Sequence, residues 1–409
     1  MNLSSVQILI HSRYDSGQLD RSKGGSMKKT LSKYGIAALA ALGLGLSFNG
    51  GAQDAKLKAA FIYIGPPGDY GWTYAHEQGR LALEKATGIE TIKVESVPEA
   101  QAGPFIDQVV KDGAKIVFTT SFGYMDGTVE AAKKYPDVIF AHASGFKRAP
   151  NLLTYFADFY QLYYLNGMMA GALSKTGKLG YVGAFPISEV KRHINAFALG
   201  ARAVNPKATV NVRWINAWFD PNKAKEATEA LLAEGNDVFA FTEDTPTVVQ
   251  TAAAKGALSF SHYSPMQKFA PKNVISGQIA DWSGIYIDIV KKVQAGTYTT
   301  KNLENVDYWW KLADKGVALG GEIGQPINPV FIDPLKAKKI GSSNVYDLVN
   351  LRLRQMNAAK PSFDPYKGPI KDRNGVVRIP AGKTASIGEL NSIEWAAQGV
   401  VGAWPNEPK

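Results

Sequence analysis

Residues 58–74 read KAAFIYIGPPGDYGWTY, in which Lys58 and six apolar residues are followed by a turn rich in glycine and proline. A buried parallel strand is typically a continuous apolar run of this length, and glycine and proline commonly end it. After the turn the pattern becomes helical, and we expect a helix over residues 74–87. This strand–turn–helix unit indicates an α/β fold.

The same order of elements recurs along the chain and restarts once, near residue 160. Short apolar strands that alternate with helices favour parallel sheets covered on both faces. Two successive sets of such units predict two Rossmann-like lobes, each an open doubly wound sheet. Further strands are expected at 91–96, 115–120, 138–141, 153–159, 178–182, 209–215, 238–241, 258–261 and 273–280, and further helices at 103–112, 127–135, 162–174, 188–204, 221–234, 247–255 and 284–295.

We expect each lobe to be built from two separate stretches of chain, joined by three crossover hinge segments. The crossovers are expected near residues 155–160, 274–282 and 308–320. The stretches are 53–157 with 281–310 for the N-terminal lobe, and 158–280 with 311–354 for the C-terminal lobe. Residues 355–409 are expected to form a C-terminal appendage with a hairpin, in which Asn374-Gly375 is a candidate type I′ turn.

The segment from Met27 to Ala52 has the three-part layout of a secretory signal peptide. A basic start is followed by the apolar run IAALAALGLGLSF at 36–48 and by small residues before Ala52. We therefore expect residues 1–26 to be a gene-start extension and residues 27–52 to be removed on export to the periplasm. The chain contains no cysteine, so we expect no lipid anchor on cysteine and no disulfide or thiolate metal site.

Composition and motifs argue against several classes of function. The net charge is +10, and residues 1–52 hold six Lys or Arg and two Asp, so the rest carries about +6. These basic residues are scattered, which predicts no nucleic-acid partner. We find no HExxH, Gly-x-Ser-x-Gly or P-loop motif. Glu243 and Asp244 could be paired carboxylates and His262 a catalytic group, but we expect a protein that is not an enzyme and binds no cofactor.

The candidate ligand site follows from the loops at the carboxyl ends of the strands, where ligands bind in open α/β sheets. These loops are rich in aromatic side chains and hold a few acids and hydroxyls, with almost no Lys or Arg. Aromatic faces stack on a flat heterocycle, and carboxylates accept its N–H groups. The candidate ligand-binding residues are Tyr70, Trp72, Thr73, Phe122, Tyr124, Phe185, Trp218, Glu243, Asp244, Tyr263, Asp281 and Trp282.

Three segments in order resemble the basic membrane protein (BMP) family. They are Gly68-Asp69-Tyr70-Gly71-Trp72-Thr73, Gly180-Tyr181-Val182-Gly183 and Trp218-Phe219-Asp220-Pro221, and the tail from Gly368 to Gly382 is similar to one branch of the family. Members are substrate-binding proteins of ABC importers with the type I periplasmic-binding-protein fold. The resemblance implies a purine base or nucleoside clamped between Trp72 and Trp218.

The chain departs from the family at Tyr263-Ser264-Pro265, where many members carry acids that bind ribose hydroxyls. This difference favours a free base such as adenine over a nucleoside. The partners we expect are this small-molecule ligand and the membrane permease of an ABC transporter, with the protein itself a monomer. Two alternatives stay open: a ligand-binding component of a signalling sensor, and the same fold with another solute such as a sugar or an amide.

Overall fold

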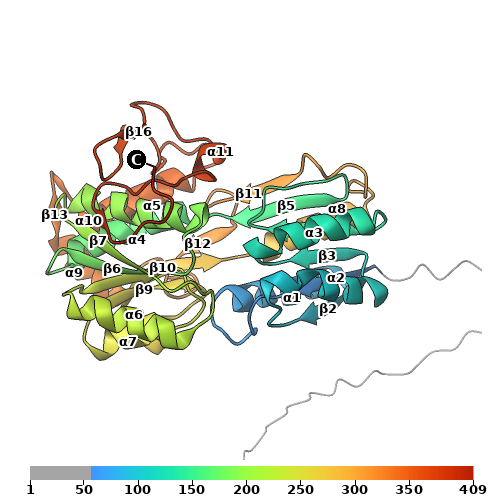
Figure 1. Ribbon diagram of the computed structural model, residues 1–409. Helices are drawn as coiled ribbons and strands as arrows, with labels where there is room; N and C mark the ends of the chain where they lie inside the picture. The colour runs from blue at the N-terminus through green and yellow to red at the C-terminus, as the bar shows by residue number, and fades with distance from the viewer. Residues whose placement is uncertain (1–56, 409) are drawn as a thin grey trace, which may run out of the picture. The chain divides into compact units, whose positions relative to one another are not determined.

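Two large sheets with helices on both faces form most of the part of the chain that the computed structural model describes, residues 57–408 (Figure 1). The expected extension at 1–26 and signal peptide at 27–52 lie outside this part. Both sheets are mainly parallel, so the expected α/β class is confirmed. Within the described residues, no helix is both long enough and apolar enough to cross a membrane.

The first sheet has six parallel strands in the order β11-β5-β4-β3-β1-β2. Successive residues of a strand face opposite sides. Phe61 accordingly packs on Tyr286 of one helix layer, with ring centroids 5.0 Å apart, whereas Ile62 joins a core with Ile106 of the other layer. The strands are β1 (Lys58–Ile62), β2 (Glu90–Val94), β3 (Ile116–Thr119), β4 (Ile139–Ala143), β5 (Leu152–Ala157) and β11 (Asp307–Trp310), and the helices α1 (Trp72–Thr87), α2 (Ala102–Lys111), α3 (Met125–Lys134) and α8 (Ser283–Gln294).

The second sheet has seven strands in the order β12-β10-β9-β8-β6-β7-β17, of which only the β10–β12 pair is antiparallel. Helices α4 and α5 cover one face, and α6 and α7 the other (Figure 1). The strands are β6 (Lys178–Gly183), β7 (Thr209–Trp214), β8 (Val238–Phe241), β9 (Leu258–Tyr263), β10 (Val274–Ala280), β12 (Val317–Leu319) and β17 (Val400–Val401), and the helices α4 (Tyr160–Leu173), α5 (Ser188–Val204), α6 (Pro221–Ala233) and α7 (Thr247–Ala254).

The chain passes between the two sheets three times: after β5, after β10 and between β11 and β12. The second passage leads directly into α8, which packs on α1 of the first lobe. A Cβ added at Gly79 of α1 would lie 2.9 Å from side-chain atoms of both Trp282 and Tyr286, so the close packing of these two helices requires glycine there.

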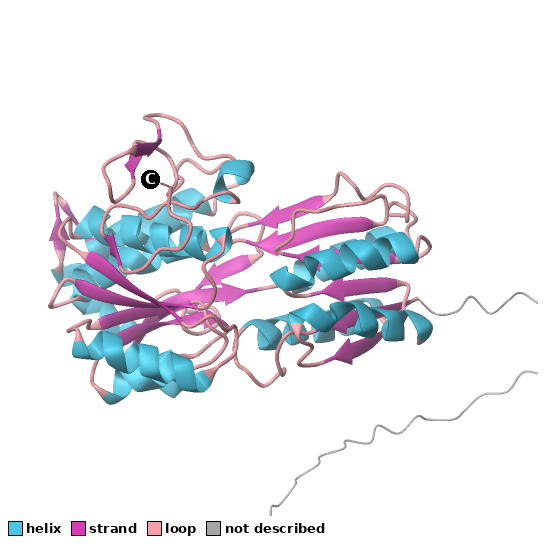
Figure 2. Cartoon of the chain, in the orientation of Figure 1, coloured by secondary structure: helices cyan, strands magenta, loops and turns pink. Residues whose placement is uncertain are grey.

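The C-terminal part of the chain packs on α4 and α5 and is mostly loop (Figure 2). Asn195 of α5 donates a hydrogen bond to the carbonyl of Trp395 at 2.8 Å and accepts one from the amide of Ala397 at 2.7 Å. β17 then extends the second sheet beside β7, a pairing that the sequence did not suggest. The remaining elements are α9 (Ile332–Ala337), β13 (Lys339–Ile340), β14 (Ser343–Asn344), α10 (Val345–Met356), β15 (Ile370–Lys371), β16 (Val377–Ile379) and α11 (Ile387–Leu390).

The hairpin of this tail exists as β15 and β16, but the expected type I′ turn is wrong. A type I′ turn needs positive φ at both central residues, and here Gly375 has φ +88° whereas Asn374 is not among the residues with positive φ. Asp372 determines the geometry instead. Its side chain accepts hydrogen bonds from the amides of Asn374 and Val376, both at 2.9 Å, and its carbonyl accepts one from Gly375 at 3.0 Å.

Candidate ligand-binding site

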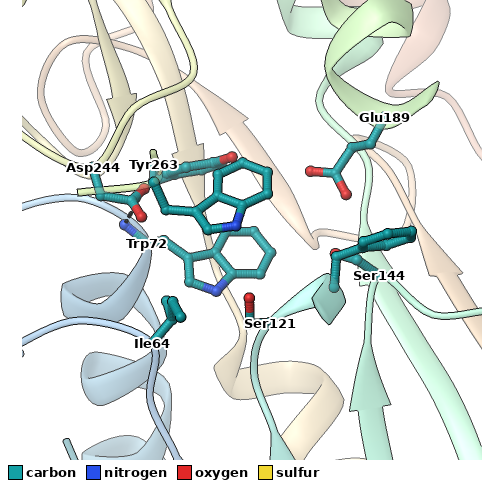
Figure 3. Close-up of a pocket in the computed structure, with 9 residues that line it drawn as sticks. Ile64, Trp72, Ser121, Ser144, Glu189, Asp244 and Tyr263 are labelled. Carbon is teal, nitrogen blue, oxygen red and sulfur yellow. Dashed lines mark hydrogen bonds between the residues drawn. The ribbon is translucent and has the colours of Figure 1, made fainter. Parts of the chain in front are cut away.

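A small cavity of about 20 Å³ lies at the carboxyl ends of strands from both sheets. Its volume is well below the ~300–1,000 Å³ range of small-molecule sites. Figure 3 shows Asp244 and Tyr263 on one side of it, Glu189 and Ser144 on the other, and Ser121 between them. The lining residues are Ile64, Trp72, Ser121, Phe122, Ser144, Glu189, Trp218, Asp244 and Tyr263.

Trp72 is positioned by the turn that precedes it. The carboxylate of Asp69 accepts hydrogen bonds from the amides of Gly71, Thr73 and Tyr74 at 2.7, 3.0 and 2.9 Å, which satisfies free N–H groups at the start of α1. The indole N–H donates to the carbonyl of Thr120, and the ring packs edge-on against Tyr263 with centroids 5.0 Å apart. Trp72 is therefore held rigidly and is only 7% exposed.

Trp218 reaches the cavity from the second lobe. It lies just before α6, which begins with Pro221 after an Asp220 side chain that accepts from the amide of Lys223 at 3.0 Å. Its ring packs against Phe185 at 5.1 Å, and its indole Nε1 donates to Glu99 of the first lobe at 3.3 Å. Trp218 is partly buried and lies in a loop, so it depends less on the core than Trp72 does.

The two lobes touch at the edge of this cavity. The amide of Trp72 donates to Asp244 Oδ1 at 3.4 Å, and the hydroxyl of Ser264 donates to the carbonyl of Tyr70. Gly71 lies so close to Asp244 that a Cβ at position 71 would be 2.6 Å from the Asp244 Cα. The structure therefore has the lobes in contact around the cavity.

Several carboxyl groups near the cavity have raised pKa values because burial disfavours their charged form. Burial raises the pKa of Asp69 to about 6 and that of Glu189 to about 7. Burial also raises the pKa of Asp244, and the nearby Asp69 and Glu243 charges raise it further. The pKa of Glu243 is raised by burial as well. Such acids can accept an N–H from a ligand when ionised or donate an O–H when protonated.

The structure brings five of the twelve predicted residues to the cavity, namely Trp72, Phe122, Trp218, Asp244 and Tyr263. The other seven do not line it. Thr73 and Asp281 bond within the starts of α1 and α8, and Tyr124 donates to the carbonyl of Val97 in the core. Glu243 and Trp282 are completely buried. Tyr70 packs on Phe269, and Phe185 lies against Trp218.

Four lining residues were not on the predicted list: Ile64, Ser121, Ser144 and Glu189. Ile64, Ser121 and Ser144 follow strands β1, β3 and β4. They therefore lie at the carboxyl ends of strands, where the sequence analysis looked for ligand-binding residues and selected the aromatic ones. Glu189 is different, because it belongs to the first turn of α5 and a helical acid gives no such signal. Among residues 57–408, no group of three or more His, Asp or Glu side chains is placed to hold a metal ion.

A family model matches residues 56–346, and its description is ABC transporter substrate-binding protein PnrA-like (Bmp). A purine-binding protein of Brucella abortus is 39% identical over 356 residues, which cover 86% of this chain and 95% of the relative. A candidate ABC transporter glucose-binding protein of Haloferax volcanii is 36% identical, over 70% of this chain and 72% of that protein.

Solved structures agree on the fold. A solute-binding protein of an ABC transporter system from Aeropyrum pernix matches with a TM-score of 0.62 at 16% identity, covering 74% of this chain and 91% of that one. A second such protein, from Conexibacter woesei, matches with a TM-score of 0.56 at 22% identity, over 73% of this chain and 95% of that one. At these identities the match concerns the fold alone.

Proposed function

Because the chain belongs to the Bmp family of PnrA-like ABC transporter substrate-binding proteins, we propose that it captures a purine base or nucleoside in the cavity between its lobes. The observation that carries the proposal is the pairing of Trp72 with Trp218 in one cavity that also holds Asp244 and Glu189. Indole faces attract a flat ring, and the carboxyl groups match N–H donors at its edges.

The name of the Brucella relative, a purine-binding protein, supports this ligand class. In our proposal the mature chain is exported through the segment at 27–52, acts as a monomer in the periplasm and delivers its ligand to a membrane permease. The ligand would favour the form with the lobes in contact, in proportion to its higher affinity for that form. The chain takes no part in covalent chemistry.

A sugar is the second candidate, because the Haloferax relative is described as a candidate glucose-binding protein. Sugars also stack on aromatic rings, but a site for them needs many polar groups around their hydroxyls. The present cavity offers Ser121, Ser144, Glu189, Asp244 and the hydroxyl of Tyr263 beside its apolar and aromatic walls. This lining supports the purine more than the sugar.

The test is a thermal-shift screen of residues 53–409 against purine bases, nucleosides, glucose and simple amides. We expect adenine or its nucleoside to raise the melting temperature, since a ligand at 100 times its Kd stabilises by about 2.7 kcal/mol. A shift with glucose and none with any purine would contradict the proposal.

A further inference from the structure

Glu99 lies in the first lobe, in a short 3-10 turn (Glu99–Gln101) between β2 and α2. The base of this turn is fixed by Val97, which is almost completely buried. The amide of Val97 donates to the carbonyl of Tyr63 at 2.9 Å, and its carbonyl accepts from the hydroxyl of Tyr124 at 2.6 Å. The backbone that carries Glu99 is therefore anchored in the core of the first lobe.

The carboxylate of Glu99 is held by two donors from the loop after β3. The hydroxyl of Ser121 donates to Glu99 Oε1 at 2.6 Å, and the amide of Gly123 donates to the same oxygen at 2.9 Å. Gly123 also leaves room for the carboxylate, since a Cβ at position 123 would overlap the carboxyl carbon of Glu99. Contacts within the first lobe alone thus place this oxygen.

Trp218 meets the same oxygen from the second lobe. Its indole Nε1 donates to Glu99 Oε1 at 3.3 Å. The ring of Trp218 lines the ligand cavity and packs on Phe185 of its own lobe, whereas Glu99 lies outside the cavity lining. Because a hydrogen bond at the indole nitrogen restricts rotation of the ring, Glu99 fixes the face that Trp218 presents to the cavity.

We infer that Glu99 is a positioning residue for ligand capture, which holds the indole of Trp218 in place only while the lobes are in contact. The two residues belong to different lobes, so separation of the lobes breaks their hydrogen bond and frees the indole. Hydrogen bonds to a charged acceptor are stronger than neutral ones, so this bond also favours the form with the lobes in contact. The role in capture rests on the proposed function, but the coupling of Glu99 to lobe contact does not.

Calorimetry with adenine and adenosine tests the role in capture, on wild-type protein, Glu99→Ala, Trp218→Ala and the double variant. Glu99→Ala should weaken binding by about tenfold, the effect of one hydrogen bond to a charged group. In the Trp218→Ala background the same change should have less than about a twofold effect, because the indole that Glu99 holds is gone. Glu99→Gln should restore most of the affinity, since its amide oxygen can accept from the same three donors.

Glu95→Ala is the matched control, because Glu95 is an exposed acid of the same lobe whose carboxylate pairs with Lys93. It should leave Kd unchanged. If Glu99→Ala causes no loss of affinity, or an equal loss with and without Trp218, the inference is overturned, while purine binding by wild-type protein upholds the proposed function.

The coupling to lobe contact is tested without any ligand. The chain has no cysteine, so Glu130→Cys on α3 and Glu229→Cys on α6, both at exposed positions, place one spin label on each lobe. Pulsed electron paramagnetic resonance should give a longer and broader distance distribution with Glu99→Ala than without it, and an unchanged distribution with Glu99→Gln or Glu95→Ala. The same distribution in all four proteins overturns the coupling. If wild-type protein binds neither purine, the proposed function and the role in capture fail, and these distances still decide the coupling.

Discussion

At the scale of single residues, Trp218 offers the cleanest test of stacking. Trp72 is 7% exposed and packs on several rings, so its removal would also damage the core. Trp218 lies in a loop and is partly exposed. Trp218→Ala should weaken purine binding by about 2 kcal/mol, roughly thirtyfold in Kd, because one face of the ligand loses its aromatic partner.

Calorimetry with adenine measures this effect, and Phe219→Ala is the control, since Phe219 is the next residue and its side chain is 43% exposed. Equal affinity in the Trp218 variant and the Phe219 variant would show that the ligand does not stack on Trp218.

Glu189 gives a prediction about pH. Burial raises its pKa from 4.5 to about 7, so the folded state binds its proton more tightly than the unfolded state. The stability that this group contributes is present below about pH 4.5 and is lost as the pH rises toward 7. Glu189→Gln removes the titrating group and with it this loss. The free energy of unfolding of the variant minus that of wild type should therefore be about 1–3 kcal/mol larger at pH 8 than at pH 5.

Urea unfolding of both proteins at several pH values measures this difference. The buried histidines, such as His142 and His193 with pKa values lowered to about 4, titrate in the opposite sense but are common to both proteins. Parallel pH profiles would contradict the assignment of a raised pKa to Glu189.

Some of the cavity residues could be predicted from the sequence and others could not, for physical reasons. Trp72, Trp218 and Asp244 follow strands and could be found by the strand-end rule. Glu243 and Asp244 are neighbours, and only the structure shows that one lines the cavity while the other is buried behind it. Glu189 belongs to a helix, and its approach to the cavity depends on tertiary packing that no local pattern reports.

At the scale of elements, the start of α1 lies against the loop after β8 through Gly71. A Cβ there would be 2.6 Å from the Cα of Asp244, so Gly71→Ala should hold the lobes apart and weaken adenine binding by at least about tenfold. Gly68→Ala is the matched control in the same turn, because a Cβ at Gly68 meets nothing within 4 Å.

Calorimetry gives the affinities, and small-angle scattering with saturating adenine should show a larger radius of gyration for Gly71→Ala than for Gly68→Ala. The same radius and affinity in both variants would mean that this contact is not needed for ligand capture.

The C-terminal segment is attached to α5 through Asn195. This buried amide bonds to backbone groups of Trp395 and Ala397, so Asn195→Ala leaves a buried carbonyl and a buried amide without partners. The free energy of unfolding should fall by about 1–3 kcal/mol in urea unfolding. Gln398→Ala, at an exposed position of the same segment, should change it little, and equal stabilities would show that the segment is not held by Asn195.

The elements themselves were largely predictable, because apolar strands and amphipathic helices repeat with regular spacing from Lys58 to Gln294. The tail was not. β17 has two residues, too few to show any periodicity, and its place beside β7 is a long-range contact. The turn after Asp372 is not type I′, because the Asp372 side chain accepts hydrogen bonds from the backbone of the turn. An Asn-Gly pair alone does not reveal these hydrogen bonds.

At the scale of the whole molecule, two sheets each contribute strand-end residues to one cavity. The repeated strand–helix pattern predicts two lobes, but it does not determine which loops meet. That meeting depends on the three passages between the sheets and on contacts such as Trp72 with Asp244 and Trp218 with Glu99.

The most direct test of the central claim is a crystal structure of residues 53–409 grown with adenine. We predict electron density for one purine ring between the indoles of Trp72 and Trp218, with ring or amino N–H groups directed at Asp244 or Glu189. A purine bound elsewhere on the molecule, or a cavity that stays empty in crystals grown with saturating adenine and in crystals grown with saturating adenosine, would contradict the account.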